Sequence, residues 1–278
     1  MKVFYSDKMV ANTGSYSPSA GKPRLAVASW LDQKFDITLI APTPVTREQL
    51  HRAHSRKFVD GVLSLRDSDG FGGRSREVAD SLLYTSGAML DAAREAINTG
   101  KFTCAPVSGF HHAGYNFSGG FCTFNGLMVT ALDLLESTYA RRVGILDCDQ
   151  HYGNGTDDII EHLHLDREVV HFTTGSQDHK ASEFLAELPD LMFKLYKDCD
   201  VLLYQAGADA HVNDPLGGWM TTQELFERDR LVFQTAREMG LPVAWDLAGG
   251  YQRDASGGIP AVLEIHDNTM IACLEAQK

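Results

Sequence analysis

The stretch of sequence that decides the fold is VGILDCDQHYGNGT, residues 143–156. Its opening run, Val143–Asp147, is apolar up to a terminal aspartate, which is typical of a buried strand. Strand side chains alternate between two faces, so Asp147, Asp149 and His151 point the same way if the extended conformation continues. Carboxylate and imidazole donors without a thiolate suit a catalytic divalent metal ion, and a cation would offset the repulsion between the carboxylates. The stretch therefore predicts a metal site at the end of a strand.

The same stretch has a second interpretation. Its polar residues could simply cap the helix that follows, with Asn154 or Thr156 at the N-cap. That accounts for Asn154 or Thr156 but leaves the two aspartates and the histidine without a reason. We therefore favour the metal interpretation.

The rest of the chain alternates between short apolar runs and helical patterns. The runs expected to form strands are Ile37–Ile40, Cys104–Val107, Val143–Asp147, Val169–Thr173, Val201–Gln205 and Val243–Leu247. The helical patterns are Ser81–Asn98 before Gly100, Asn125–Ser137, and a helix that begins at the capping box of Thr221 and Glu224 and ends at Met239 before Gly240. This alternation predicts an α/β fold of one domain, residues 1–278, with a mostly parallel sheet covered by helices on both faces.

Polar residues follow several of the predicted strands. His111 and His112 follow one strand, Asp209 a second and Tyr251 a third. Each has an ordinary alternative: a structural histidine, a turn aspartate, or a tyrosine packed in the core. Because ligands bind outside the carboxyl ends of parallel strands, their convergence indicates a site. Asp209 would be a third metal ligand, the histidines an acid/base or hydrogen-bonding pair, and Tyr251 a hydrogen-bond donor.

Composition excludes several classes of protein. The chain has 278 residues, 44% of them hydrophobic, and a net charge of −12 with no basic tract, so nucleic acid is not an expected partner. No apolar run reaches the ~18 residues of a membrane span, and the start of the chain does not resemble a secretory signal. The five scattered cysteines indicate reduced thiols. We expect a cytoplasmic protein without a membrane partner, whose oligomeric state, a homo-oligomer included, stays open.

The motifs taken together resemble the histone deacetylase superfamily, which includes the bacterial acetylpolyamine amidohydrolases. In the expected order they are GFHHA at 109–113, GFCTFN at 120–125, DCDQHYGNGT at 147–156, GADAHVNDPLG at 207–217 and GGY at 249–251. The variant with Asn154 and DPLG is closer to the class II and polyamine branch than to class I. The resemblance implies the arginase–deacetylase fold, a parallel sheet of about eight strands flanked by helices.

The resemblance also implies a zinc-dependent hydrolysis of an acyl amide. The zinc ligands would be Asp149, His151 and Asp209, and a structural potassium ion would lie near Asp147 and Thr173. In the same segment Gly175 stands where a histidine is common. The zinc ion would polarise the carbonyl and lower the pKa of a bound water.

The remaining catalytic roles follow from the same resemblance. His112 would act as general base and then as acid, supported by His111, which is tied to Asp147. Tyr251 would donate a hydrogen bond to the developing oxyanion. Asn154 replaces the aspartate that class I enzymes place behind the second histidine, and a neutral amide should leave His112 a base at neutral pH.

The resemblance also points to residues that would contact the substrate. Phe121 would line a tunnel, with Gly120 beside it and the carbonyl of Gly249 facing the channel. Phe184, or another residue of the loop after Thr174, is a candidate for a second tunnel aromatic. Further contacts would come from Leu216 and Asp69, although Asp69 could equally be a turn residue.

A slender acyl-amine substrate, a small molecule or a peptide, is expected. In one branch of the family that this chain resembles, polyamine-selective members have a glutamate at the position of Leu216, which binds a second ammonium group. Leu216 cannot make that ion pair, which favours acyl-lysine over an acetylpolyamine. An arginase-like ureohydrolase with two metal ions would need extra carboxylates where Tyr152, Gly153, Ala210 and His211 stand. A ligand-binding relative without activity is expected to have lost a ligand, Tyr251 or the histidine pair, and none is missing.

Overall fold

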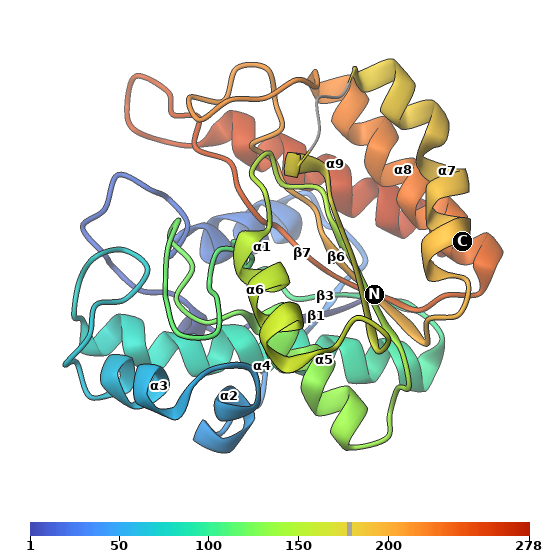
Figure 1. The fold of residues 1–278 in the computed structure, drawn as a ribbon. Helices are drawn as coiled ribbons and strands as arrows, with labels where there is room; N and C mark the ends of the chain where they lie inside the picture. Colours follow the sequence, from blue (N-terminus) through green and yellow to red (C-terminus); the bar gives the residue numbers. More distant parts are fainter. Residues whose placement is uncertain (177–179) are drawn as a thin grey trace.

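One sheet of seven parallel strands runs through the described part of this computed structural model, residues 1–176 and 180–278 (Figure 1). The strand count is near the expected value, and every neighbouring pair is parallel. From one edge to the other the strands are β2 (Thr38–Ile40), β1 (Lys2–Phe4), β3 (Phe102–Cys104), β7 (Val243–Asp246), β6 (Val201–Gln205), β4 (Val143–Asp147) and β5 (Val169–Thr173).

Helices cover both faces of the sheet, as predicted. One layer consists of α1 (Lys22–Asp32), α7 (Ala181–Tyr196), α8 (Thr222–Met239) and α9 (Pro260–Ala276). The other consists of α2 (Arg47–Ala53), α3 (Arg56–Leu63), α4 (Arg76–Thr99), α5 (Gly126–Glu136) and α6 (Asn154–Leu163). Figure 1 shows α7, α8 and α9 on one side of the strands and α2 to α5 on the other. None of the helices in these ranges is long and apolar enough to cross a membrane.

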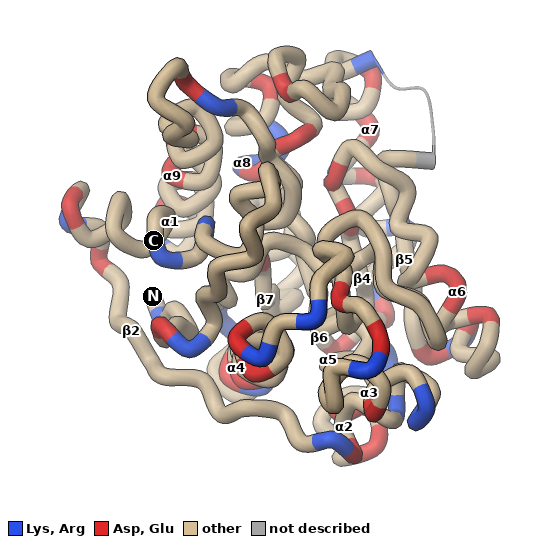
Figure 2. Tube along the Cα trace, turned by 90° about the vertical axis from the view of Figure 1, so that its left-hand side faces the viewer, with Lys and Arg blue, Asp and Glu red and all other residues tan. Residues whose placement is uncertain are grey.

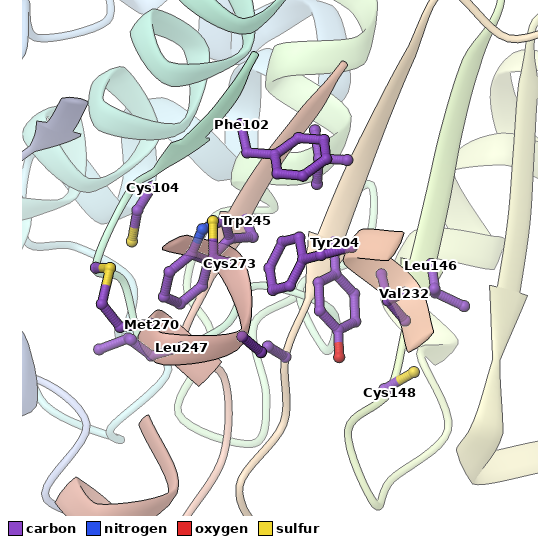
Figure 3. Close-up of a cluster of buried hydrophobic side chains, with 14 of the residues drawn as sticks. Phe102, Cys104, Leu146, Cys148, Tyr204, Val232, Trp245, Leu247, Met270 and Cys273 are labelled. Carbon is purple, nitrogen blue, oxygen red and sulfur yellow. The ribbon is translucent and has the colours of Figure 1, made fainter. Parts of the chain in front are cut away.

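Strand side chains alternate between two hydrophobic clusters, one on each face. In β4, Ile145 packs with the α2–α6 layer and Leu146 with the layer that contains α8 and α9. Figure 3 shows part of the second cluster, where Trp245 of β7 lies near Cys273 and Met270 of α9. Because both faces are buried, the strands have continuous apolar sequences rather than an alternation of apolar and polar residues.

The sequence predicts β4, β5 and β6 better than the rest of the sheet. β4, β5 and β6 have the predicted bounds, β2 begins one residue late and β7 ends one residue early. The prediction for β3 is wrong: the strand is Phe102–Cys104, not Cys104–Val107. The amide of Ala105 still donates to the carbonyl of Trp245 at 2.9 Å, but the amide of Val107 then turns back to the carbonyl of Ala105 and ends the regular strand. β1 has too few residues to show a periodic pattern.

The predicted helix signals lie at helix ends. α8 has the capping box between Thr221 and Glu224, and Gly240 ends it in a left-handed conformation. Asn125 caps α5 through its side chain. α4 begins earlier than predicted, at Arg76, because Ser75 provides its N-cap.

A buried carboxylate joins three helices of the α2–α6 layer. Asp133 of α5 accepts hydrogen bonds from Gln49 and Arg52 of α2, at 2.8 and 2.6 Å, and from Arg94 of α4, at 2.5 Å. Figure 2 shows charges of both signs where α2, α3 and α5 lie together. The Asp133 side chain is 4% exposed, whereas each arginine is 33% exposed.

Replacing Asp133 with alanine is expected to lower the free energy of unfolding by about 2 kcal/mol, because Arg94 loses its buried carboxylate partner and Arg52 keeps only Glu136. Asp80→Ala is the matched control: it removes the exposed i,i+4 pair with Arg76 and should cost less than about 0.5 kcal/mol. Urea denaturation of both variants measures the difference. Equal losses would contradict the role given to Asp133.

Candidate functional site

Asp149, His151 and Asp209 lie together at the carboxyl ends of β4 and β6. Their ligand atoms are all within 4.8 Å of one another. His151 Nδ1 is 3.1 Å from Asp149 Oδ1 and 3.1 Å from Asp209 Oδ2. Ligands at zinc bond lengths of about 2.0 Å in a tetrahedron are separated by about 3.3 Å. The three side chains therefore fit a zinc ion, and the donor set of one nitrogen and two oxygens suits a catalytic site.

Negative charge is concentrated at these three residues. Burial and the neighbouring Asp149 carboxylate raise the pKa of Asp209 to about 7. Hydrogen bonds to Asp149 and Asp209 raise the pKa of His151 to about 10. The arrangement thus favours a positive charge among the three groups, either a proton on His151 or a metal ion in its place.

Two glycines let the ligand-bearing loops approach each other. A Cβ on Gly207 would lie 2.5 Å from Asp149 Cα, and one on Gly249 would lie 2.3 Å from Asp209 Cγ. The amide of Gln150 donates to Asp209 Oδ1 at 3.1 Å, which joins the two loops directly. The position of Asp209 beside Asp149 therefore depends on glycine at both places.

The tandem histidines each have a polar partner. His111 Nδ1 donates to Asp147 Oδ2 at 2.6 Å, and His112 Nδ1 donates to Asn154 Oδ1 at 2.6 Å. Asp147 is itself held by Gln205 Nε2 at 2.8 Å. His111 Nε2 lies 3.6 Å from Asp149 Oδ1, so the histidine pair adjoins the candidate metal ligands.

The helix-cap interpretation of this stretch is wrong. The N-cap of α6 is Gly153, which makes no side-chain capping bond, and Asn154 is the first helical residue. Asn154 binds His112 instead, and the Thr156 hydroxyl accepts a hydrogen bond from Asn125 Nδ2 at 3.0 Å.

The two histidines differ in their electrostatic surroundings. Against the effect of burial, the Asp147 and Asp149 carboxylates raise the pKa of His111 to about 9. Burial and the charge of the adjacent His111 lower the pKa of His112. His111 is thus the group that carries a positive charge at neutral pH, and His112 is the group with an unprotonated Nε2.

Tyr251 lies on a loop with an unusual backbone. Ala248, Gly249 and Gly250 have φ values of 38°, 37° and 93°. The amide of Tyr251 donates to Asp214 Oδ2 at 2.7 Å, and burial together with the Asp149 and Asp209 charges raises the pKa of the phenol. Tyr251 therefore keeps its proton at neutral pH and is able to donate it in a hydrogen bond.

Lys22, the first residue of α1, binds the loop that precedes Tyr251. Its fully buried Nζ donates to the carbonyls of Ala248, at 3.0 Å, and Gly249. Burial lowers the pKa of Lys22 to about 8. The Gly249 carbonyl, expected to face a substrate channel, thus already has a donor. A single lysine at a helix start gives no signal in the sequence.

Aromatic side chains gather beside Tyr251. The ring of Phe121, in a left-handed conformation with φ 65°, lies 5.6 Å from that of Tyr251. Tyr16 and Phe71, which the sequence does not single out, contact Phe121 at ring distances of 5.5 and 5.9 Å. Phe184 does not belong to this group: it is buried in the core and packs against Trp219. The loop after Thr174, the other source considered for a second aromatic, includes residues 177–179, which lie outside the described residues.

The other residues expected at the substrate take separate positions. A Cβ on Gly120 would lie 2.2 Å from His112 Cδ2, so glycine here allows His112 its place. Leu216 is 38% exposed, and its amide donates to Asp214 Oδ1 at 3.0 Å. Asp69 is buried, and its Oδ1 accepts from the amides of Phe71 and Gly73 at 2.9 and 3.0 Å, which is the arrangement of a turn residue.

Asp147 and Thr173 are register partners on β4 and β5. The Thr173 hydroxyl accepts from the Gly153 amide at 3.3 Å, and the Thr174 hydroxyl donates to the Asp149 carbonyl at 2.9 Å. A Cβ on Gly175 would lie 2.1 Å from the backbone of His151, which explains the absence of a histidine there. A potassium site at Asp147 and Thr173 stays a prediction.

Comparison with known proteins shows which protein family the chain matches. A family model described as histone deacetylase domain matches residues 21–174 and 166–263. The chain is 30% identical to an uncharacterized protein of Picosynechococcus and to a probable deacetylase of Methanothermobacter thermautotrophicus, over 65% and 63% of its length. It is 27% identical to acetylpolyamine amidohydrolase 1 of Pseudomonas aeruginosa over 63% of its length. These alignments span 66%, 60% and 58% of the three relatives.

A solved structure shares the fold. The acetylpolyamine aminohydrolase of Burkholderia pseudomallei superposes with a TM-score of 0.76 over 98% of this chain and 97% of that chain, at 16% identity. At that identity the likeness concerns the fold alone.

Gly249→Ala is expected to weaken zinc binding about tenfold or more, because the new methyl group would displace Asp209. Gly257→Ala is the matched control: its φ is also positive, at 85°, but the added Cβ meets nothing within 4 Å. Isothermal titration of metal-free protein with zinc measures both affinities. Wild-type affinity in Gly249→Ala would show that Asp209 does not need this glycine.

Proposed function

Because this chain belongs to the histone deacetylase family, we propose that it is a zinc-dependent amidohydrolase that removes an acyl group, acetyl in the simplest case, from an amine. The observation that carries the proposal is the meeting of Asp149, His151 and Asp209 with the pair of His111 and His112. The rings of His112 and His151 are 5.8 Å apart, so the histidine pair borders the candidate metal ligands. We also propose that residues 1–278 act as one catalytic domain, and the free cysteines support a reducing, cytoplasmic setting.

Asp149, His151 and Asp209 would hold the zinc ion. When bound, zinc supplies Lewis acidity, which polarises an amide carbonyl and lowers the pKa of water. A second metal ion of the arginase type has no support, because the group of metal-ligating side chains within the described ranges consists of these three residues. Near Asp147 and Thr173 we propose a potassium ion that has a structural role and takes no part in the reaction.

His112 is the proposed general base. Its Nδ1 proton is committed to Asn154, so Nε2 carries the lone pair that accepts a proton from the attacking water. The same atom would then give that proton to the leaving amine. His111, paired with Asp147, keeps a positive charge beside the reacting atoms and stabilises the negative charge that develops there.

Tyr251 is the proposed oxyanion donor. The raised pKa of its phenol keeps the hydroxyl proton available. The hydrogen bond from its backbone amide to Asp214 fixes the residue, and Lys22 binds the carbonyls of the same loop. A hydrogen bond that strengthens as the carbonyl oxygen becomes negative lowers the barrier rather than tightening substrate binding alone.

We propose an acyl-lysine side chain, in a peptide or as a small molecule, as the substrate. Tyr16, Phe71 and Phe121 form an aromatic rim that suits a slender methylene chain. Arg253 binds the carbonyl of Tyr16 through Nε and Nη2, which puts positive charge beside this rim. A polycationic chain would meet that charge, and Leu216 offers no carboxylate to offset it. Acetylpolyamine hydrolysis is the second candidate, favoured by the names of the Pseudomonas and Burkholderia relatives.

Tyr251→Phe tests the reaction. The variant is expected to keep its zinc and lose about 10²–10³ in kcat on an acetyl-lysine peptide, the usual effect of removing one oxyanion donor. Tyr139→Phe, which removes an exposed hydroxyl elsewhere, is the control. Near wild-type kcat in Tyr251→Phe with full zinc content would remove Tyr251 from the mechanism, and a wild-type enzyme inactive on every acyl amine would overturn the proposal.

Side-by-side kinetics test the substrate. The kcat/KM for acetyl-lysine peptides is expected to equal or exceed that for acetylputrescine and acetylspermidine. A preference for the polyamines above tenfold, about 1.4 kcal/mol of transition-state binding, would reverse the assignment. Leu216→Glu adds a carboxylate at an exposed position and is expected to shift the ratio toward acetylspermidine, whereas Leu216→Gln should not.

A further inference from the structure

A charged pair lies on the face of α8 that is otherwise apolar. Arg228 and Asp229 fall between Leu225 and Val232, which pack in the core. Their side chains are each 1% exposed, and Arg228 Nε donates to Asp229 Oδ1 at 2.8 Å. Two charges in such a place cost desolvation energy, and their mutual attraction alone does not explain their presence.

Asp229 serves as the anchor of the pair. Its Oδ1 accepts from the Tyr204 hydroxyl as well as from Arg228, and its Oδ2 accepts from the Thr269 hydroxyl at 2.5 Å. Tyr204 belongs to β6 and Thr269 to α9, so three elements fix the carboxylate. The orientation of the Arg228 guanidinium is fixed in turn.

The Nη1 end of the Arg228 guanidinium contacts the two loops that carry the candidate metal ligands. Its Nη1 donates to the Gly207 carbonyl at 2.8 Å and to the Cys148 carbonyl at 3.2 Å. Cys148 directly precedes Asp149, and Gly207 lies two residues before Asp209. One nitrogen atom thus joins the main chains of both loops.

The two loops approach closely at this point. The amide of Cys148 donates to the Gln205 carbonyl at 3.0 Å, and a side chain on Gly207 would collide with the backbone of Asp149. Two carbonyl oxygens face the same region and repel each other unless a donor lies between them. The Arg228 guanidinium is that donor.

We propose that Arg228 is a positioning residue for the metal centre: it holds the Asp149 and Asp209 loops at the separation that a divalent metal ion requires and so sets metal affinity. The inference rests on the proposed zinc centre and goes beyond it, because Arg228 contacts neither the metal ligands' side chains nor the reacting atoms. Partners that orient metal ligands typically change metal affinity 10- to 100-fold when removed.

The test measures zinc affinity in metal-free protein by competition with a chelator, together with the absorption spectrum of the cobalt-substituted protein. Arg228→Met is expected to weaken zinc binding about 10- to 100-fold. Arg228→Lys keeps the charge beside Asp229 but lacks the fork that reaches from Asp229 to both carbonyls, and about a tenfold loss is expected. Arg230→Met, which removes the half-exposed pair with Glu227 on the same helix, should leave affinity and spectrum unchanged.

The outcomes separate a positioning role from a structural one. Lower thermal stability in Arg228→Lys with wild-type zinc affinity and an unchanged cobalt spectrum would overturn the inference and leave the zinc centre standing. If Arg228→Met does not fold, Arg228→Lys decides. Failure of the wild-type protein to bind zinc, or equal binding by Asp209→Asn, would instead remove the proposed metal centre and the inference with it.

Discussion

Buried negative charge at the carboxyl ends of β4 and β6 is the constraint on which the rest of the structure depends. Each carboxylate there needs a cation or hydrogen-bond donors, since the interior solvates charge poorly. The carboxylates are Asp147, Asp149 and Asp209. The donating groups that bind them are His111, His151 and Gln205. The Lys22 ammonium lies close enough for the charges of Asp209 and Asp149 to act on it. The arrangement of loops and helices around the edge follows from the need to bring these groups together.

The helix layer of α1, α7, α8 and α9 therefore does more than cover the sheet. Lys22 of α1 binds the loop before Tyr251, and Arg228 of α8 binds the loops before Asp149 and Asp209. In both cases a long side chain crosses the core and ends at main-chain carbonyls. The reacting side chains extend from one side of these loops, and Lys22 and Arg228 contact the main chain from the other. These contacts therefore leave the functional atoms of the reacting side chains free.

Sequence alone predicts the parts of this molecule that depend on local pattern. The bounds of β4, β5 and β6 follow from their buried apolar runs, and the strand-end motifs bring Asp149, His151 and Asp209 together. What it misses depends on contacts distant in the chain. Lys22 reaches a loop 227 residues away, and β3 ends where a local turn interrupts its ladder. Phe184, expected at the site, lies in the core, and Tyr16, which had no expected role, contacts Phe121. Nothing local in the sequence distinguishes a core aromatic from one at a site. Arg228 did leave a signal: a charged pair on the apolar stripe of α8.

The order of strands in the sheet has a consequence for how the chain is made. β7, the last strand to leave the ribosome, lies between β3 and β6 at the centre of the sheet. Until it emerges, the nascent chain holds two separate pieces, β2-β1-β3 and β6-β4-β5, with open edges and exposed apolar faces. Such a chain can complete its sheet only after β7 has been made.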